Sequence, residues 1–167
     1  AVVGNVILQA ENDFTFTNDV ALAAGSLVAQ AGRHVDVNAN LSTANANIHL
    51  EADSPHSSSG SSGTGDVDIE SGVTVNSNGG NIALIGDDFI VDGNIETESG
   101  NVTIARTLEN AIIIGGGGEH ISQNELDRMT ISGNLTIGQA TTAGVKCRRP
   151  MACSSSSPSR GGKFSKY

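Results

Sequence analysis

The chain has 167 residues, a formal net charge of −9 at pH 7, 21 glycines, no tryptophan and only 3% aromatic residues. This length suits one domain, and because large side chains are scarce its core must be filled by Val, Ile, Leu and Ala. Residues 1–144 contain three basic residues against all 18 acidic ones, a formal charge of −15 that repels nucleic acid and anionic membranes. No stretch reaches the length of a membrane-spanning helix, so we expect no membrane insertion.

A short apolar-x-apolar phrase after a small residue opens the chain and returns about every 20 residues. It reads GNVIL (4–8), GSLVA (25–29), ANIHL (46–50), GDVDI (65–69), GNIAL (80–84), GNVTI (100–104) and GNLTI (133–137). A second run follows in nearly every unit, as FTF (14–16), VDV (35–37), VTV (73–75), FIV (89–91), III (112–114) and MTI (129–131). A shorter third run appears at Val20–Leu22, Leu41 and Ile95.

Alternation over such short runs is typical of strands with one buried face and one exposed face. Three strands in each unit, joined by Gly, Asn and Asp turns, predict an all-β parallel β-helix (β-solenoid) with about 20 residues per rung. The turn after the second run reads FTND, VNAN, VNSN and VDGN, at 16–19, 37–40, 75–78 and 91–94, and its asparagines can bond in a ladder along the corner. An up-and-down antiparallel barrel is the alternative fold.

Two insertions interrupt the repeat domain, which we assign to residues 1–144. Residues 53–65 are polar and of low complexity, which predicts a flexible loop. Residues 115–129 predict a loop and one short helix near 122–129, because Ser122 and Glu125 fit a capping box and Leu126 and Met129 share a face. Residues 145–167 form a basic, Ser/Gly-rich tail that we expect to be disordered, with two cysteines whose spacing favours a disulfide or free thiols over zinc.

Acidic residues cluster in the middle of the repeat domain. The segments GDVDIES and GDDFIVDG supply the candidate ligands for weak calcium binding, namely Asp66, Asp68, Glu70, Asp87 and Asp88. The first three alternate with Val67 and Ile69, so they share the outer face if those two residues point inward. The same carboxylates fit acid–base chemistry on a polysaccharide, or a solvated acidic face without any ligand.

Other chemical signatures are missing from the sequence. The segment IIIGGGGEHISQ fails the dinucleotide fingerprint at His120 and has no βαβ context. The histidines His34, His49, His56 and His120 show no ligand spacing. We therefore assign no catalytic residue and no cofactor-binding residue, and we expect no cofactor apart from weakly bound calcium.

The repeat units resemble those of the filamentous haemagglutinin-type exoproteins of bacterial two-partner secretion. The segment ISQNELDRMTISGNLTIG (121–138) is similar to a unit that recurs in very large proteins of that type, and the resemblance covers about residues 4–144. It implies a right-handed parallel β-helix that is secreted or displayed at the bacterial cell surface as part of an adhesin shaft, without an active site. The chain opens inside a repeat, so neighbouring rungs of a longer parent chain are expected partners.

The functional hypothesis is a structural and adhesive segment that presents a surface to host or matrix glycans and proteins and lacks catalysis. The two insertions are the expected contact points, because loops on a rigid scaffold often carry binding. The alternative is a polysaccharide-active β-helix lyase or hydrolase, which needs acids and a basic residue in one groove. The three arginines of residues 1–144 lie far apart in the sequence, and Arg106 near Asp87 and Asp88 is the pairing to test. A third hypothesis is a passive spacer.

Overall fold

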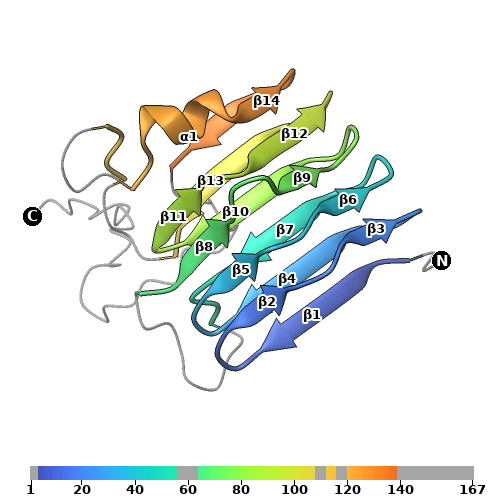
Figure 1. Cartoon of the computed structure of the whole chain (residues 1–167), viewed down its shortest axis with the longest axis horizontal. Coiled ribbons are helices and arrows are strands. Elements are labelled where there is room, and N and C mark those ends of the chain that lie inside the picture. The colour runs from blue at the N-terminus through green and yellow to red at the C-terminus, as the bar shows by residue number, and fades with distance from the viewer. Residues whose placement is uncertain (1–3, 56–63, 108–111, 116–119, 139–167) are drawn as a thin grey trace, which may run out of the picture.

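The computed structural model describes residues 4–55, 64–107, 112–115 and 120–138, whose strands form three parallel sheets (Figure 1). The first sheet has the order β1 (Val6–Ala10), β4 (Leu27–Ala31), β7 (Ile48–Glu51), β10 (Ile82–Gly86), β13 (Val102–Arg106) and β15 (Leu135–Ile137). The second is β11 (Asp88–Val91), β8 (Asp66–Ile69), β5 (Val35–Val37) and β2 (Phe14–Phe16). The third is β14 (Met129–Ile131), β12 (Asn94–Glu98), β9 (Thr74–Asn76), β6 (Leu41–Thr43) and β3 (Val20–Leu22).

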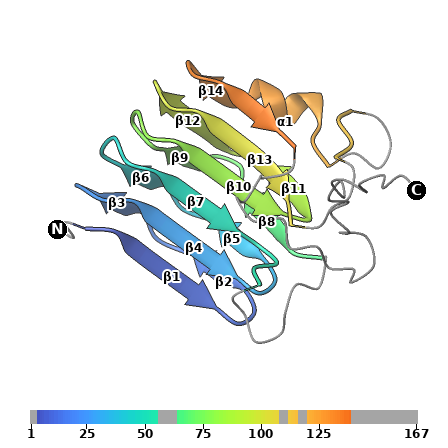
Figure 2. The same cartoon turned by 180° about the vertical axis from the view of Figure 1, so that it is seen from behind.

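Strand pairing in the described residues is parallel throughout, so the predicted parallel β-solenoid is confirmed and the antiparallel barrel is wrong. Both views show the rungs stacked from β1 at one end to β14 at the other (Figure 1, Figure 2). Val6 pairs with Leu27, and Leu27 pairs with Ile48, so these rungs are 21 residues apart. Ile82 pairs with Val102 20 residues later, which confirms the predicted rung length.

The core is a narrow column of aliphatic side chains. In β4 the residues alternate between buried and half-buried positions, and Leu27, Ala29 and Ala31 are all buried. The residues that β4 pairs with in β7, Ile48 and Leu50, are buried in the same way, because parallel pairing without a register shift keeps like positions on one face. The core is therefore filled by stacked Val, Ile, Leu and Ala, as the composition predicts.

The insertion at 53–65 falls within a rung, so the two strands after it lie one sheet later than the sequence predicted. GDVDI was expected to open a rung and VTV to be its second strand, but β8 lies in the second sheet and β9 in the third. The reason is that the rung opens at β7 and the insertion interrupts it before its second strand. The turn at 75–78 therefore follows a third-sheet strand rather than a second-sheet strand.

The predicted helix is confirmed as α1 (Gln123–Asp127), with Ser122 as its N-cap and a capping box between Ser122 and Glu125. Leu126 and Met129 pack partly against the core. The MTI run forms β14 in the third sheet, not a second-sheet strand, and Ile114 makes only a single bridge, to Ile121. Both runs were assigned wrongly because α1 stands where the next second-sheet strand would lie.

The predicted insertions are only partly within the described residues. Asp53 and Ser54, at the start of the 53–65 segment, are buried, and the Asp53 backbone N–H donates to the Arg33 carbonyl oxygen at 2.9 Å. Residues 56–63 and 116–119, and the tail at 145–167, lie outside the described residues. The flexibility expected of the loop and the tail stays a prediction.

The corner between the third and first sheets is built from a repeated polar turn. The buried hydroxyls of Thr43, Ser77 and Thr97 donate to carbonyl oxygens three residues later, those of Ala46, Gly80 and Gly100, at 2.6, 2.5 and 2.9 Å. Next to this turn the Oδ1 atoms of Asn47, Asn81 and Asn101 each accept, at 2.9 Å, from the backbone N–H of the next asparagine in the column, Asn81, Asn101 and Asn134. A shorter ladder, Asp19–Asn40–Thr74, forms at the corner where the sequence predicted one.

Candidate functional site

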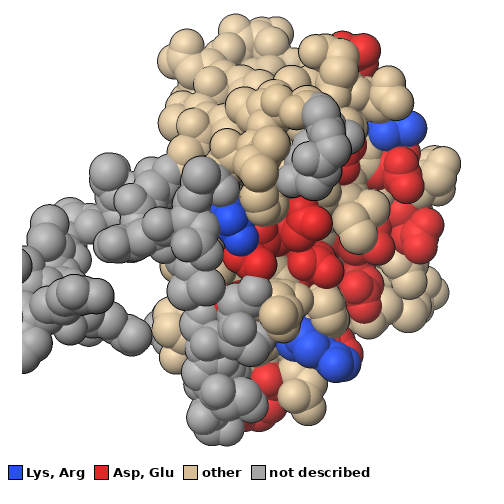
Figure 3. Space-filling model, turned by 90° about the vertical axis from the view of Figure 1, so that its left-hand side faces the viewer, with Lys and Arg blue, Asp and Glu red and all other residues tan. Residues whose placement is uncertain are grey.

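The outer side of the second sheet gathers carboxylates from three strands. Val67 and Ile69 of β8 are buried, so Asp66 and Asp68 point outward as predicted. The register places Asp66 beside Asp88 of β11, and Asp68 beside Asp36 of β5. We call the residues Asp36, Asp66, Asp68, Glu70 and Asp88 the acidic face, and Figure 3 shows acidic side chains crowded together on this side of the molecule.

Each arginine of the repeat domain pairs with a carboxylate next to an end of a second-sheet strand. Arg106 pairs with Asp87, and their side chains are only 9% and 20% exposed. Arg33 pairs with Asp13, and Arg128 lies 3.3 Å from Asp92. The pairing of Arg106 with Asp87, which the sequence flagged as the one to test, is present in the structure.

Two members of the acidic face, Asp66 and Asp68, have a raised pKa. Burial raises the pKa of Asp66 above its usual value, and Asp88, Asp87 and Asp36 add to this rise while His34 opposes it. For Asp68, burial is again the main cause of the raised pKa, followed by the repulsion of Glu70, Asp36, Asp92 and Asp66. Burial first, and then the like charges of neighbouring carboxylates, thus make ionisation of Asp66 and Asp68 costly.

The opposite effect holds at Asp13, outside the acidic face. Its hydrogen bond from Arg33 lowers its pKa from 3.8 to about 2. Ionised Asp13 therefore favours folding above pH 3.8, and that contribution is lost as the pH falls toward 2.

We expect Asp68→Asn to raise the free energy of unfolding at pH 7. Because the folded protein holds the Asp68 proton more tightly than the unfolded chain, ionised Asp68 disfavours folding, and this cost disappears as the pH falls through its folded pKa toward 3.8. The gain should stay below about 1 kcal/mol, since solvent still screens this partly exposed group. Urea unfolding at pH 7 and pH 3 measures it, with Asp127→Asn on α1 as the control. A loss of stability at pH 7 in Asp68→Asn alone would contradict the account.

The five candidate calcium ligands come together only in part. Asp66, Asp68 and Asp88 lie side by side on the acidic face, Glu70 follows β8 at an exposed position, and Asp87 is paired with Arg106. Within the described ranges, no group of three or more His, Cys, Asp or Glu side chains is arranged to hold a metal ion. Calcium binding stays a prediction.

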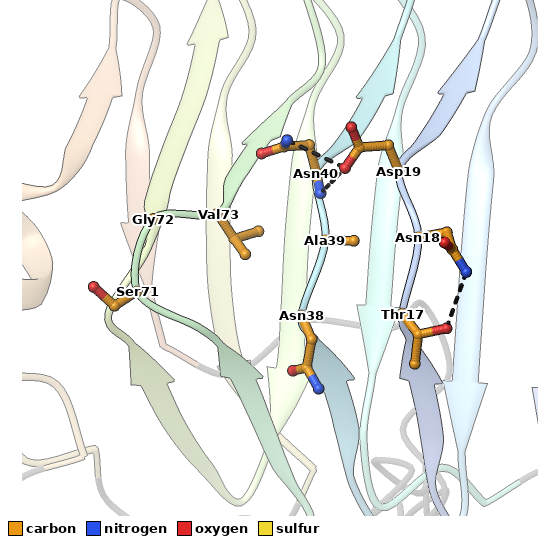
Figure 4. Close-up of a pocket in the computed structure, with 9 residues that line it drawn as sticks. All are labelled: Thr17, Asn18, Asp19, Asn38, Ala39, Asn40, Ser71, Gly72 and Val73. Carbon is orange, nitrogen blue, oxygen red and sulfur yellow. Dashed lines mark hydrogen bonds between the residues drawn. The ribbon is translucent and has the colours of Figure 1, made fainter.

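The structure adds a depression that sequence reasoning missed. It has a volume of about 640 Å³ and lies at the corner after the second-sheet strands (Figure 4). We call it the asparagine groove, lined by Thr17, Asn18, Asp19, Asn38, Ala39, Asn40, Ser71, Gly72 and Val73. The available signal was the run of asparagines in the turns at 16–19 and 37–40, which the sequence explained only as corner residues.

Two kinds of side chain line the groove. Asp19 and Asn40 belong to the corner ladder, where Asp19 Oδ1 accepts from the Asn40 backbone N–H at 2.9 Å. Asn38 and Ser71 are exposed on either side of the groove and are open to a ligand. No lysine or arginine is among the lining residues. The groove therefore offers neutral hydrogen-bonding groups and one carboxylate.

The histidines do not form a site within the described residues. His34 Nδ1 lies 3.5 Å from Asp66, His49 Nε2 lies 3.2 Å from Glu51, and His120 Nδ1 accepts from the Ile113 backbone N–H. His56 lies outside the described residues, as do four residues of the segment that contains the glycine run, 116–119.

The fold places the chain in the class of parallel β-solenoids, and comparison with known proteins adds nothing to this. No family model matches the chain, and no curated protein or solved structure matches it either. In the part of the chain that the structure describes, α1 is far too short and polar to cross a membrane, and no other helix there could do so.

Proposed function

We propose that the chain is a structural and adhesive segment of a secreted or cell-surface bacterial exoprotein of the filamentous haemagglutinin type. The observation that carries this proposal is the constant spacing of outward side chains, which bond from rung to rung. Gln9 Nε2 donates to Gln30 Oε1 at 2.9 Å, and Gln30 Nε2 donates to Glu51 Oε2 at 2.6 Å. This ladder joins three successive rungs from the outside and stiffens that part of the stack, which suits a shaft that displays contact sites.

The charge of the molecule narrows the partners that this proposal allows. The acidic face repels sulfated or otherwise anionic glycans, as well as nucleic acid. The asparagine groove, with neutral donors and acceptors, matches the hydroxyl groups of an uncharged glycan. We therefore propose uncharged host or matrix glycans as ligands of the groove and basic protein segments as partners of the acidic face.

We expect the double variant Asn38→Ala/Ser71→Ala to bind an uncharged glycan between about threefold and thirtyfold more weakly, since each lost neutral hydrogen bond is worth about 1 kcal/mol. Both side chains are exposed and lie outside the corner ladder, so folding should be unaffected. Glycan arrays identify the ligand, and titration calorimetry measures its affinity for the full chain. Ser132→Ala, an exposed serine away from the groove, is the control. Equal binding by the variant and the control would contradict a glycan site in the groove.

One observation favours the alternative, a polysaccharide-active enzyme. Arg106 pairs with Asp87, and Asp87 helps to raise the pKa of Asp66. A basic residue thus lies near two carboxyl groups, one of which has a raised pKa. The groove, however, lies at another corner, and its one carboxylate, Asp19, is held in the ladder. A test for new sugar ends separates this alternative from the adhesive proposal.

A further inference from the structure

The last described strand of the second sheet, β11, has an edge that another strand would ordinarily cover. In the lower rungs the carbonyl oxygens of Phe16, Val37 and Ile69 accept from the backbone N–H groups of the next rung, those of Asn38, Glu70 and Asp92, at 3.0, 3.1 and 2.9 Å. Val91 is the next member of this column, because it pairs with Ile69. Within the described residues, β11 ends the order of its sheet.

Side chains take the place of the missing strand at this edge. The Val91 backbone N–H donates to Glu125 Oε1 at 2.9 Å, and Arg128 Nη1 donates to the Val91 carbonyl oxygen at 3.0 Å. The Phe89 backbone N–H, which faces the same way, donates to Asp88 Oδ1 at 2.9 Å. Glu125 in the middle of α1 and Arg128 at its C-terminal end thus satisfy both backbone groups of Val91.

The helix holds these two side chains in place. The second oxygen of Glu125, Oε2, accepts from the Ser122 backbone N–H at 2.6 Å, so one carboxylate joins the helix start to the edge of β11. Arg128 is the C-cap of α1, and its guanidinium also lies 3.3 Å from Asp92, the residue after β11. Ile121 is 1% exposed and anchors the segment in the core.

We propose that α1 is an edge cap that prevents a second copy of this chain from adding a strand at β11. An uncovered edge strand is a template for pairing with another chain, and charged side chains over the edge are a known way to block it. The cap is specific to the second sheet, because β14 and β15 continue the third and first sheets by one strand each. The edge that α1 covers is the edge of β11, where a second-sheet strand from another copy of the chain would pair in register.

The test compares two double variants of the full chain. Glu125→Ala/Arg128→Ala removes both contacts with Val91, while Gln123→Ala/Asp127→Ala removes an exposed pair on α1, bonded at 2.7 Å, that leaves β11 covered. We expect only the first variant to self-associate, with a dimer dissociation constant at least tenfold lower than that of the unmodified protein in sedimentation experiments. Amide exchange at Val91 should be slow in the unmodified protein and in the control.

A third variant shows whether association uses β11. Adding Val91→Pro to Glu125→Ala/Arg128→Ala removes the outward N–H, and proline is tolerated on an edge strand with this orientation. We expect this variant to return to the monomer. Three results would overturn the proposal: rapid exchange of the Val91 amide in the unmodified protein, a monomeric first variant whose Val91 amide exchanges rapidly, or association that persists with proline at position 91.

Discussion

Replacing Gly100 with alanine should lower the free energy of unfolding by about 3 kcal/mol or more, because overpacking at a fixed backbone contact forces the rungs apart. A Cβ at Gly100 would lie 1.7 Å from the carbonyl oxygen of Gly80 in the rung below. That atom is backbone and cannot rotate away, unlike the end of a flexible side chain. Urea unfolding of the variant and the unmodified protein measures the loss.

The same column of the solenoid contains its own control. Register aligns Gly4, Gly25, Ala46, Gly80, Gly100 and Gly133. A Cβ at Gly4 would meet no atom within 4 Å, so Gly4→Ala should change stability by less than about 1 kcal/mol. Ala46 is the one member of this column that already carries a Cβ. Ala46 lies next to Gly25, which is the one member with a left-handed backbone (φ 85°). Equal effects at Gly4 and Gly100 would show that close rung contact is not the cause.

Replacing Arg106 with methionine should cost about 3 kcal/mol, because removing one partner of a mostly buried ion pair leaves the other charge uncompensated. The remaining carboxylate, Asp87, would stand near Asp66, whose pKa it already helps to raise. Methionine keeps much of the volume of the arginine stem, so the loss reports charge more than packing. Unfolding at low and at high salt measures it, and screening should reduce the loss at high salt.

A double-mutant cycle isolates the contribution of this ion pair. Asp87→Asn in the Arg106→Met background removes the uncompensated charge and should recover part of the lost stability. If Asp87→Asn leaves Arg106→Met no more stable, then the ion pair is not what Arg106 contributes.

The fold could be predicted from the sequence because strand alternation and rung length are both encoded locally. GNIAL and GNVTI differ by 20 positions, and the residues they align, such as Ile82 and Val102, pair in the structure. The sheets to which β8 and β9 belong could not be predicted, because the sequence of a low-complexity insertion does not show at which point of a rung it falls. The place of α1 over β11 was also hidden, since a carboxylate bonded to a distant backbone N–H leaves no local pattern.

Only the part of the candidate site that depends on local alternation within one strand could be predicted. The outward direction of Asp66 and Asp68 follows from alternation with Val67 and Ile69, which are buried. The neighbours of these carboxylates on other rungs, Asp88 and Asp36, depend on register between strands. The asparagine groove arises from three turns that are 21 to 34 residues apart, as the ladder Asp19–Asn40–Thr74 shows, so only the folded chain brings its lining together.

The measurement that tests the central claim most directly exposes the full chain to a panel of glycans and matrix proteins, with and without Ca²⁺. Each sample is read for retained protein and for new reducing or unsaturated sugar ends. The account predicts retention on uncharged glycans without new sugar ends, and any calcium dependence would point to Asp66, Asp68, Glu70, Asp87 or Asp88. Release of new sugar ends would contradict it and would make the acidic face an active site, and the absence of both signals would contradict the adhesive role and leave a passive spacer.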